Sequence, residues 1–396
     1  MGRVDIVADS RCSLVTSFAS TWDREAVALL QTLSGAHGIH ASEAGTANYR
    51  AVFTRDAVMA GVAGLLLADD TVTGGFVRTL EQLRALQGAE GQVASNFEVQ
   101  EGKAPTVSFG TLAPRIDAAT WYLVGVGLAA RAGAIAPGEF RASAAAVVRL
   151  LDALEYNGRH LVYIPTGGNW ADEYVYEGYI LYDQVLRAWA LQLLSTTYEQ
   201  PAWRTKSQAI AAAISERYFT GERSAPEHPI ASYSPVRRFE MFDLAACALL
   251  AVSGIAPQRA RQALDWIDTN FLQRDALPPA FHPVIDEGDR DWEALQRYHL
   301  HGFRNAPHEY HNGGIWPIWL GWLALAEAQA GASAHLSRLR GITASKLHAL
   351  DRFDFEEYLN GRSGAAGGTP RMAYTATGLV FLKLAGSDAQ RALLTP

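Results

Sequence analysis

The stretch V-F-T-R-D-A-V-M-A-G-V-A-G-L-L-L, residues 52–67, decides the fold class. Its apolar residues recur at intervals of three and four, the period that gives an α-helix an apolar face. The same period returns along the whole chain, at 22–33, 76–86, 118–132, 144–154, 181–194, 209–218, 242–252, 260–271, 316–328, 335–350 and 373–384. Strand-like alternation is short, with 162–164 as its best case. We therefore predict an all-α protein of about twelve helices.

About twelve helices fit a bundle, an α-solenoid or a closed double ring of helices. A solenoid is disfavoured because no repeat of fixed period is visible. The 396 residues show no break in composition, so we predict one domain over 1–396. Aromatic and polar residues gather in long segments between the helices, at 91–115, 159–178, 223–238, 281–314 and 353–371. Loops of that length in a compact domain usually carry the function.

Composition excludes several classes of function. The net charge of −7, without long runs of either sign, gives no basic surface for nucleic acid. No window approaches the length of a membrane-spanning helix, and the first ten residues are too acidic for a signal peptide. Two cysteines are too few for a disulfide framework, and neither has metal-ligand spacing. We predict a cytoplasmic protein without metal or cofactor; whether it forms a homo-oligomer stays open.

The segment N-W-A-D-E-Y-V-Y-E-G-Y, residues 169–179, is the first candidate site. It places Trp170, Asp172 and Tyr174 directly before a predicted helix. Aromatic rings stack on the apolar faces of sugars, and an apolar wall raises the pKa of an acid so that it can donate a proton. The segment therefore indicates a carbohydrate site. The alternative is a helix N-terminus whose acids favour the helix dipole.

The segment F-D-F-E-E-Y-L-N-G-R-S-G, residues 353–364, is the second candidate. It sets Glu356, Glu357 and Tyr358 before a glycine-rich turn. The turn lacks the Gly-Lys-Ser/Thr ending of a phosphate-binding loop, which argues against a nucleotide. A solvated acidic turn is the alternative.

The segment H-E-Y-H-N-G-G-I-W-P, residues 308–317, is the third candidate. His308 and His311 are three residues apart, one short of the H-E-x-x-H zinc motif, and the following glycines do not continue a helix easily. A metal site is therefore disfavoured. We predict instead that His311, Asn312 and Trp316 line a polar pocket where a loop meets a helix.

Charged residues also enter apolar helices. Arg55 and Asp56 stand in the first helical stretch, and Arg115 and Asp117 open a later one. Charges in apolar surroundings are costly unless they are paired or face a cavity. These residues are either structural Arg–Asp pairs or part of a site. Asp243 caps or flanks a further core helix.

Taken in order, these segments resemble the alkaline/neutral invertases of glycoside hydrolase family 100, and more distantly the wider clan of inverting glycosidases with an α/α barrel. The segments F-T-R-D-A-V-M-A-G (53–61), P-R-I-D-A-A-T-W-Y (114–122) and M-F-D-L-A-A-C-A-L-L-A-V-S-G-I-A (241–256) follow the family's order. The most specific match is H-E-Y-H-N-G-G-I-W-P, beside the family's Tyr-His-Asn-Gly-Gly-Ser-Trp-Pro. The resemblance implies an (α/α)6 barrel, a double ring of helices whose long loops form the mouth of the active site.

The resemblance also implies roles for individual residues. Asp172 matches the general acid of the family, and Glu357 matches its general base, with Glu356 as a rival because a motif does not separate adjacent acids. Inverting hydrolysis needs such a pair, one carboxyl protonating the leaving group and the other activating water. The implied ligands of a small carbohydrate are Arg55, Asp56, Asp117, Trp170, Tyr174, His311, Asn312, Trp316 and Tyr358.

The sequence departs from the invertase pattern in two places. The family's Asp-Arg-Arg-Met-Gly reads D-E-Y-V-Y at 172–176. After the turn of the base, its Lys-Gln aligns with T-P at 369–370 and its Gln-Thr-Trp with Y-T-A at 374–376. The resemblance makes sucrose the leading substrate, and these departures keep trehalose, kojibiose and glucosylglycerate as alternatives. Two interpretations compete with a hydrolase. One is a sugar 2-epimerase on the same barrel, which would use His299, His301, His308 or His311. The other is a non-catalytic sugar-binding barrel.

Overall fold

The computed structural model describes residues 10–44, 49–155, 159–219, 228–300 and 302–395. Each of the twelve predicted helical segments corresponds to a helix there, and most ends differ by a few residues. The largest shift is at α1, which begins twelve residues before the predicted segment, at Ser10. α7 begins eight residues early because Pro201 fits the first helical position and polar residues fill the first turns. The all-α prediction is confirmed.

Six helices within the described residues form a closed inner ring, in which each contacts the next and the last contacts the first. They are α2 (Thr54–Leu67), α4 (Ile116–Arg131), α6 (Leu181–Thr197), α8 (Leu244–Val252), α11 (Pro317–Gln329) and α13 (Ala373–Leu384). These helices are apolar on nearly every face, as in L-A-A-C-A-L-L-A-V of α8. Helices of that composition are buried on all sides, and here both ring neighbours and an outer layer cover them.

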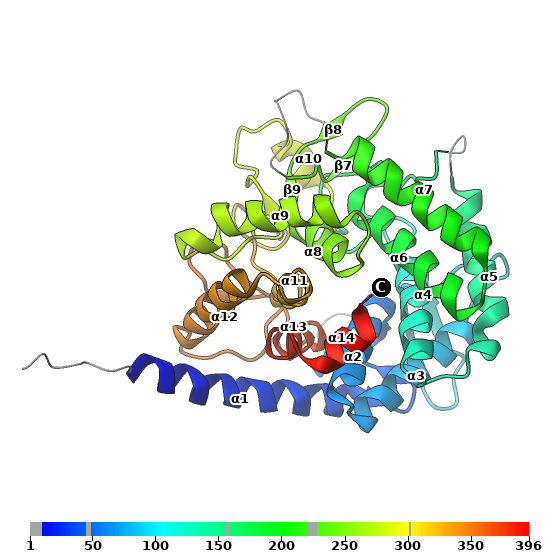
Figure 1. Ribbon diagram of the computed structural model, residues 1–396, viewed down its shortest axis with the longest axis horizontal. Helices are drawn as coiled ribbons and strands as arrows, with labels where there is room; N and C mark the ends of the chain where they lie inside the picture. The colour runs from blue at the N-terminus through cyan, green and yellow to red at the C-terminus, as the bar shows by residue number, and fades with distance from the viewer. Residues whose placement is uncertain (1–9, 45–48, 156–158, 220–227, 301, 396) are drawn as a thin grey trace, which may run out of the picture.

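The outer layer consists of one helix against each inner helix (Figure 1). These are α1 (Ser10–Leu33), α3 (Asp70–Ala85), α5 (Pro137–Ala153), α7 (Pro201–Arg217), α9 (Pro257–Asn270) and α12 (Ser333–His348). They bury only one face, as α9 does with Ala260, Ala263, Leu264 and Ile267. Two short helices, α10 (Trp292–Arg297) and α14 (Asp388–Leu394), and the 3-10 turn η1 (Leu272–Arg274) complete the described helices. The double ring is an (α/α)6 barrel, which confirms the predicted fold.

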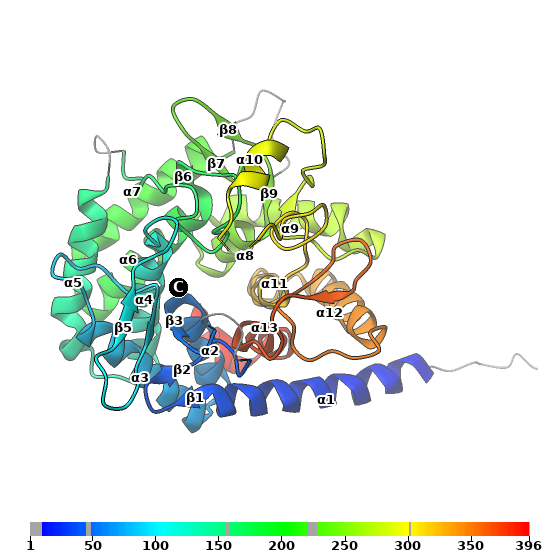
Figure 2. The same ribbon diagram turned by 180° about the vertical axis from the view of Figure 1, so that it is seen from behind.

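Short strands join the helices in small antiparallel sheets. They are β1 (Ser34–Gly35), β2 (Gly38–Ile39), β3 (Val52–Phe53), β4 (Asn96–Glu98), β5 (Thr106–Ser108), β6 (Tyr179–Ile180), β7 (Ser232–Tyr233), β8 (Arg238–Phe239), β9 (Phe242–Asp243), β10 (Phe281–His282), β11 (Tyr358–Leu359) and β12 (Ala366–Gly367). β3, β6 and β9 run directly into α2, α6 and α8. Strands and long loops overlie the ring in the view of Figure 2. The N-terminal ends of four of the inner helices, α2, α4, α11 and α13, lie at one cavity.

Candidate active site

A cavity of about 230 Å³ lies at the N-terminal ends of α2, α4, α11 and α13. It is lined by Tyr49, Phe53, Arg55, Asp56, Ser95, Asn96, Thr111, Leu112, Arg115, Trp170, Asp172, Glu173, Leu300, Arg304, Tyr310, Trp316, Glu357, Thr369, Met372 and Tyr374. Residues from several of the predicted functional loops meet here. Asp172 and Glu357, proposed from the sequence as acid and base, line the same cavity.

The loop that carries Asp172 is closed by hydrogen bonds at its ends and held by buried side chains before and after Asp172. Ile164 and Gly178 exchange two backbone hydrogen bonds of 2.8 Å, which close the loop. Trp170 is buried against Phe281, with ring centroids 5.6 Å apart in a stacked arrangement. Asp172 is thereby left on the cavity wall between buried neighbours, with its side chain 29% exposed.

Glu173 is buried and forms the second anchor of this loop. Its carboxylate accepts hydrogen bonds from the guanidinium of Arg304 at 3.1 Å and from the backbone amide of Leu300 at 3.2 Å. Arg304 in turn lies over the ring of Tyr310, 4.0 Å from its centroid. The acid loop and the loop before α11 are therefore tied together at the cavity.

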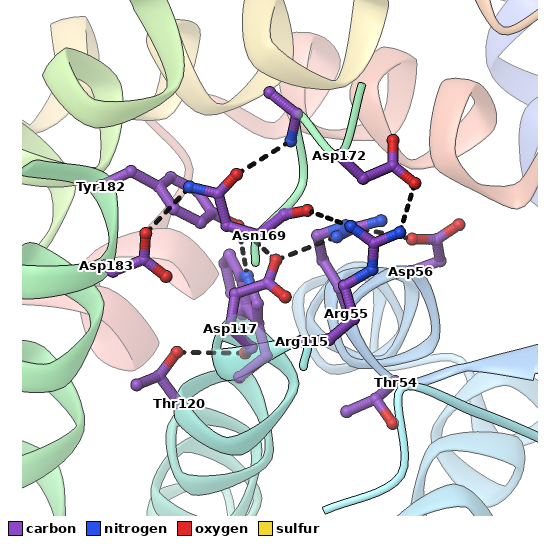
Figure 3. Close-up of polar contacts among 12 residues, drawn as sticks. Thr54, Arg55, Asp56, Arg115, Asp117, Thr120, Asn169, Asp172, Tyr182 and Asp183 are labelled. Carbon is purple, nitrogen blue, oxygen red and sulfur yellow. Dashed lines mark hydrogen bonds and ion pairs between the residues drawn. The ribbon is translucent and has the colours of Figure 1, made fainter. Parts of the chain in front are cut away.

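Arg115 forms an ion pair with Asp172 through Nη2 and Oδ2 (Figure 3). Its other terminal nitrogen donates to the backbone oxygens of Gly167 and, at 3.0 Å, of Asn169. One guanidinium thus holds both the backbone and the carboxylate of the loop. Oδ1 of Asp172 is the oxygen that this ion pair leaves to face other groups.

Glu357 stands next to β11, which pairs with β12 and whose Leu359 also bridges to Ile315 before α11. Its carboxylate accepts hydrogen bonds from the hydroxyl of Tyr49 at 3.0 Å and from the amide of Thr369 at 3.3 Å. Burial raises the pKa of Glu357 above its usual value, while Arg304 and the two hydrogen bonds act to lower it. The carboxylate is buried, held by donors and directed at the cavity.

Glu356, the rival of Glu357, is turned elsewhere. Its Oε2 accepts a hydrogen bond of 2.8 Å from the backbone amide of Asp354, and the residue does not line the cavity. Of these two adjacent acids, only Glu357 lines the cavity.

Arg55 and Asp56 enter the cavity from the first turn of α2. Arg55 donates to Oδ2 of Asp117 at 2.9 Å and lies 3.4 Å from Oδ1 of Asp56 (Figure 3). Burial raises the pKa of Asp56 to about 6, against the opposing effect of Arg55. Asp117 itself is buried behind Arg55 and does not line the cavity. Asp56 is thus the carboxylate of this group that is available to a ligand.

The aromatic residues divide between the cavity wall and the layer behind it. Trp170 and Trp316, which the sequence indicated as sugar-stacking residues, line the cavity. Tyr174 lies behind, stacked on Phe281 with centroids 4.2 Å apart. Tyr358 also lies behind the wall, stacked on Trp316 and donating its hydroxyl to Glu309 at 2.6 Å. Tyr174 and Tyr358 support the wall and do not contact the cavity.

His311 and Asn312 also lie behind the wall, although we predicted them as sugar ligands. His311 is fully buried and stacked on Trp316, with centroids 5.4 Å apart. Burial lowers its pKa well below the usual value, and the nearby arginines lower it further. The amide of Asn312 exchanges two hydrogen bonds of 2.8 Å with the backbone of Ile285. The hydrogen-bonding groups of Asn312 are thus used within the protein, where they join the loop before α11 to the segment at Ile285.

The sequence did not indicate several of the cavity residues. Tyr49, Arg304 and Leu300 each contact a predicted catalytic residue or its neighbour, yet stand in no recognisable motif. Thr369, which aligns with the family's Lys-Gln position, donates its amide to Glu357. A signal was present for Arg304, because an arginine in an aromatic loop next to the third candidate segment needs a carboxylate partner. No local pattern pointed to Tyr49.

The described residues contain no group of three or more His, Cys, Asp or Glu side chains that could hold a metal ion. His299 and His308 do not line the cavity, and His301 lies outside the described residues. Within the described part of the chain, no helix has the length and apolar character needed to cross a membrane.

Comparison with known proteins gives one limited similarity in sequence. No protein-family model matches the chain. A probable alkaline/neutral invertase D of Arabidopsis thaliana is 28% identical over 138 residues, which are 34% of this chain and 24% of that protein. The chain therefore matches about a quarter of the length of this relative.

Solved structures are similar over nearly the whole chain. A GH63 mannosylglycerate hydrolase from Thermus thermophilus aligns with a TM-score of 0.63 at 14% identity, over 91% of this chain and 100% of that one. A rhamnosidase from Klebsiella oxytoca aligns with a TM-score of 0.64 at 14% identity, over 96% of this chain and 65% of that one. A glycosidase in complex with glucose aligns with a TM-score of 0.62 at 15% identity, over 98% and 100%. This chain has the (α/α)6-barrel fold of these glycosidases.

Proposed function

We propose that the protein is an inverting glycoside hydrolase that cleaves a small glycoside in this cavity, with Asp172 as general acid and Glu357 as general base. The observation that carries the proposal is the meeting of these two carboxylates in one aromatic-lined cavity. They come from loops on opposite sides of the ring, before α6 and before α13. The partial likeness to an invertase and the glycosidase fold point the same way.

In the proposed reaction, Asp172 gives a proton to the glycosidic oxygen as the bond to the anomeric carbon breaks. Because Arg115 engages Oδ2, the transferred proton is carried by Oδ1. Glu357 takes a proton from water, and that water attacks the anomeric carbon from the face opposite the leaving group. The hydroxyl of Tyr49 and the amide of Thr369 keep the carboxylate of Glu357 in one orientation.

The remaining cavity residues suit a sugar ring. Trp170, Tyr310 and Trp316 offer aromatic surface, while Arg55 and Asp56 offer a donor and an acceptor for hydroxyl groups. The invertase resemblance favours sucrose, with trehalose, kojibiose and glucosylglycerate as alternatives. A cytoplasmic enzyme of small-carbohydrate metabolism agrees with the buried thiol of Cys247.

The sugar 2-epimerase alternative receives no support from the cavity. Ring opening and proton transfer by histidine require an imidazole that faces the sugar. His311 is fully buried, and neither it nor His299 nor His308 lines the cavity.

The test is hydrolysis of sucrose, trehalose, kojibiose, isomaltose, glucosylglycerate and glucosylglycerol, followed by proton NMR from the first seconds. We expect release of a free sugar whose anomeric configuration is opposite to that of the substrate. Release of the same anomer, or no hydrolysis of any glycoside, contradicts the proposal. Solvent deuterium at C2 of a recovered sugar would establish the epimerase instead.

A further inference from the structure

The leaving-group side of the cavity can be located from its connection to Asp172, because the general acid protonates the leaving group. Leu300 lies on this side, since its backbone amide donates a hydrogen bond to the carboxylate of Glu173, the residue after Asp172. Leu112 lies on this side as well. It lies in the loop 109–115, which the amide of Arg115 closes by a 3.0 Å hydrogen bond to the oxygen of Phe109, and Arg115 pairs with Asp172. Both leucines line the cavity.

These two leucines are unusually accessible for large apolar side chains. Leu112 is 37% exposed and Leu300 is 44% exposed, whereas most leucines of the described chain are buried. Phe109, in the same loop as Leu112, is 40% exposed. Exposed apolar side chains in the lining of a cavity, as Leu112 and Leu300 are, form a surface that gains by being covered. A ligand with an apolar face would cover it.

The arginines of the cavity are engaged by groups of the protein itself before any ligand enters, and carboxylates outnumber them. Three arginines line it, of which Arg55 pairs with Asp117 at 2.9 Å and Arg304 with Glu173 at 3.1 Å. The terminal nitrogens of Arg115 donate to Oδ2 of Asp172 and to the backbone oxygens of Gly167 and Asn169. Asp56 and Glu357 add two further carboxylates. Among the lining residues that the structure describes, there is no lysine or histidine. An anionic ligand would have to separate an existing ion pair and lie close to carboxylates, which is unfavourable.

We infer that the enzyme selects glycosides whose leaving group is uncharged and has an apolar face, which rests between Leu112 and Leu300. The inference rests on the proposed function and narrows its substrate class, because it excludes glycosides of hydroxy acids such as glucosylglycerate. Leu112 and Leu300 are the residues that determine this specificity.

The experiment compares two leaving groups of nearly equal size. Glucosylglycerol and glucosylglycerate differ only in a hydroxymethyl group in place of a carboxylate, which is ionised at neutral pH. The mannosyl pair is assayed in parallel, so that the result does not depend on one glycone. We expect kcat/KM for the glycerol glycoside to exceed that for the glycerate glycoside by about tenfold or more. An equal or higher value for the glycerate glycoside overturns the inference alone, and no cleavage of any glycoside overturns the proposed function and the inference with it.

Variants then test whether Leu112 and Leu300 contact the leaving group. Leu112→Ala and Leu300→Ala are expected to lower kcat/KM for the glycerol glycoside about threefold to tenfold, mainly through KM, with little change in Tm. Leu154→Ala is the matched control, because Leu154 is 39% exposed but does not line the cavity. Leu300→Arg is expected to shift the preference toward the glycerate glycoside by supplying a cation without a carboxylate partner. Unchanged kinetics in all three cavity variants overturn the assignment of the two leucines.

Discussion

At the residue scale, the orientation of each proposed catalytic carboxylate is set by groups that do not themselves react. Arg115 holds Asp172 and the backbone of its loop, while Tyr49 and Thr369 hold Glu357. A general acid and a general base act only when their oxygens are placed to within a fraction of an ångström. These supporting contacts are therefore as necessary to the geometry as the two carboxylates.

We predict that Asp172→Asn and Glu357→Gln each lower kcat by about a thousandfold or more, because each removes one proton-transfer step. Glu356→Gln is the matched control for Glu357→Gln, since the neighbouring carboxylate binds the amide of Asp354 and faces away from the cavity. Steady-state kinetics with the best substrate, together with circular dichroism of each variant, provide the measurement. An inactive Glu356→Gln beside an active Glu357→Gln would transfer the role of base to Glu356.

Tyr49→Phe is predicted to shift the pH profile. The hydrogen bond from Tyr49 lowers the pKa of Glu357, which burial otherwise raises. Its loss leaves the pKa of Glu357 higher, so the base becomes ionised only at higher pH. We expect the acidic limb of the kcat/KM profile to move to higher pH, with a loss of kcat/KM of about tenfold at pH 6. Tyr163→Phe, at a 39% exposed tyrosine outside the cavity, is the control, and an unmoved acidic limb contradicts the assignment.

At the element scale, the closest contact in the inner ring joins α11 and α13 and depends on two glycines. A Cβ built on Gly378 would lie 2.2 Å from the backbone oxygen of Pro317, and one on Gly321 would lie 2.4 Å from the oxygen of Gly378. Backbone atoms of packed helices do not give way as a flexible side chain does. The absence of both Cβ atoms lets the two helices approach and brings Trp316 and Tyr374 to the same cavity.

Gly378→Ala is therefore predicted to lower the free energy of unfolding by about 2 kcal/mol or more, because α11 and α13 must move apart. Gly341→Ala is the control, since Gly341 is an exposed helical glycine on α12 and a Cβ there meets nothing within 4 Å. Alanine is the better helix former, so this variant should be stabilised by roughly 0.5–1 kcal/mol. Thermal melts followed by circular dichroism compare the two, and a Tm of Gly378→Ala equal to that of the original chain would contradict the packing argument.

At the scale of the whole molecule, buried carboxylates make the stability depend on pH. Burial raises the pKa of Asp56 to about 6, that of Asp243 to about 7 and that of Glu327 to about 8. In the unfolded chain these groups titrate near pH 4. A carboxyl whose pKa is higher in the folded state stabilises the fold fully at pH below the unfolded value, and this contribution is lost as the pH rises through the folded value. These three groups therefore favour the fold near pH 5 relative to pH 8.5.

Glu327 provides the clearest test of this dependence. It lies on α11 beside His335 of α12, with Asp268 and Arg338 in the same cluster. Glu327→Gln mimics the protonated acid, so we expect its unfolding free energy to exceed that of the original chain at pH 8.5 by on the order of 2 kcal/mol and to be similar at pH 5. Glu293→Gln, at an exposed glutamate on α10, should show no such pH-dependent difference. A Glu327→Gln variant that is less stable at pH 8.5 would show that the carboxylate is ionised and stabilised by His335.

The sequence alone predicted the helices because the apolar period is a local property. Residues three and four apart share one helical face whatever the rest of the chain does. The long aromatic loops were predictable for a similar reason, because their composition fits neither a helix nor a buried core. These loops hold Trp170, Asp172, Trp316 and Glu357, all of which line the cavity. Arg55 and Asp56, singled out as charges in an apolar helix, line it as well.

Only the tertiary structure decided which polar groups meet. The contact between Tyr49 and Glu357 joins residues 308 positions apart, and the pair of Arg115 and Asp172 spans 57. Such contacts depend on the closure of the ring, where α13 returns to α2, and no local pattern encodes that distance. The same closure places Asn312 and His311 behind the wall and turns Glu357 inward while Glu356 faces away. The sequence determined which residues could serve a sugar site, and the packing of six helix pairs determined which of them reach it.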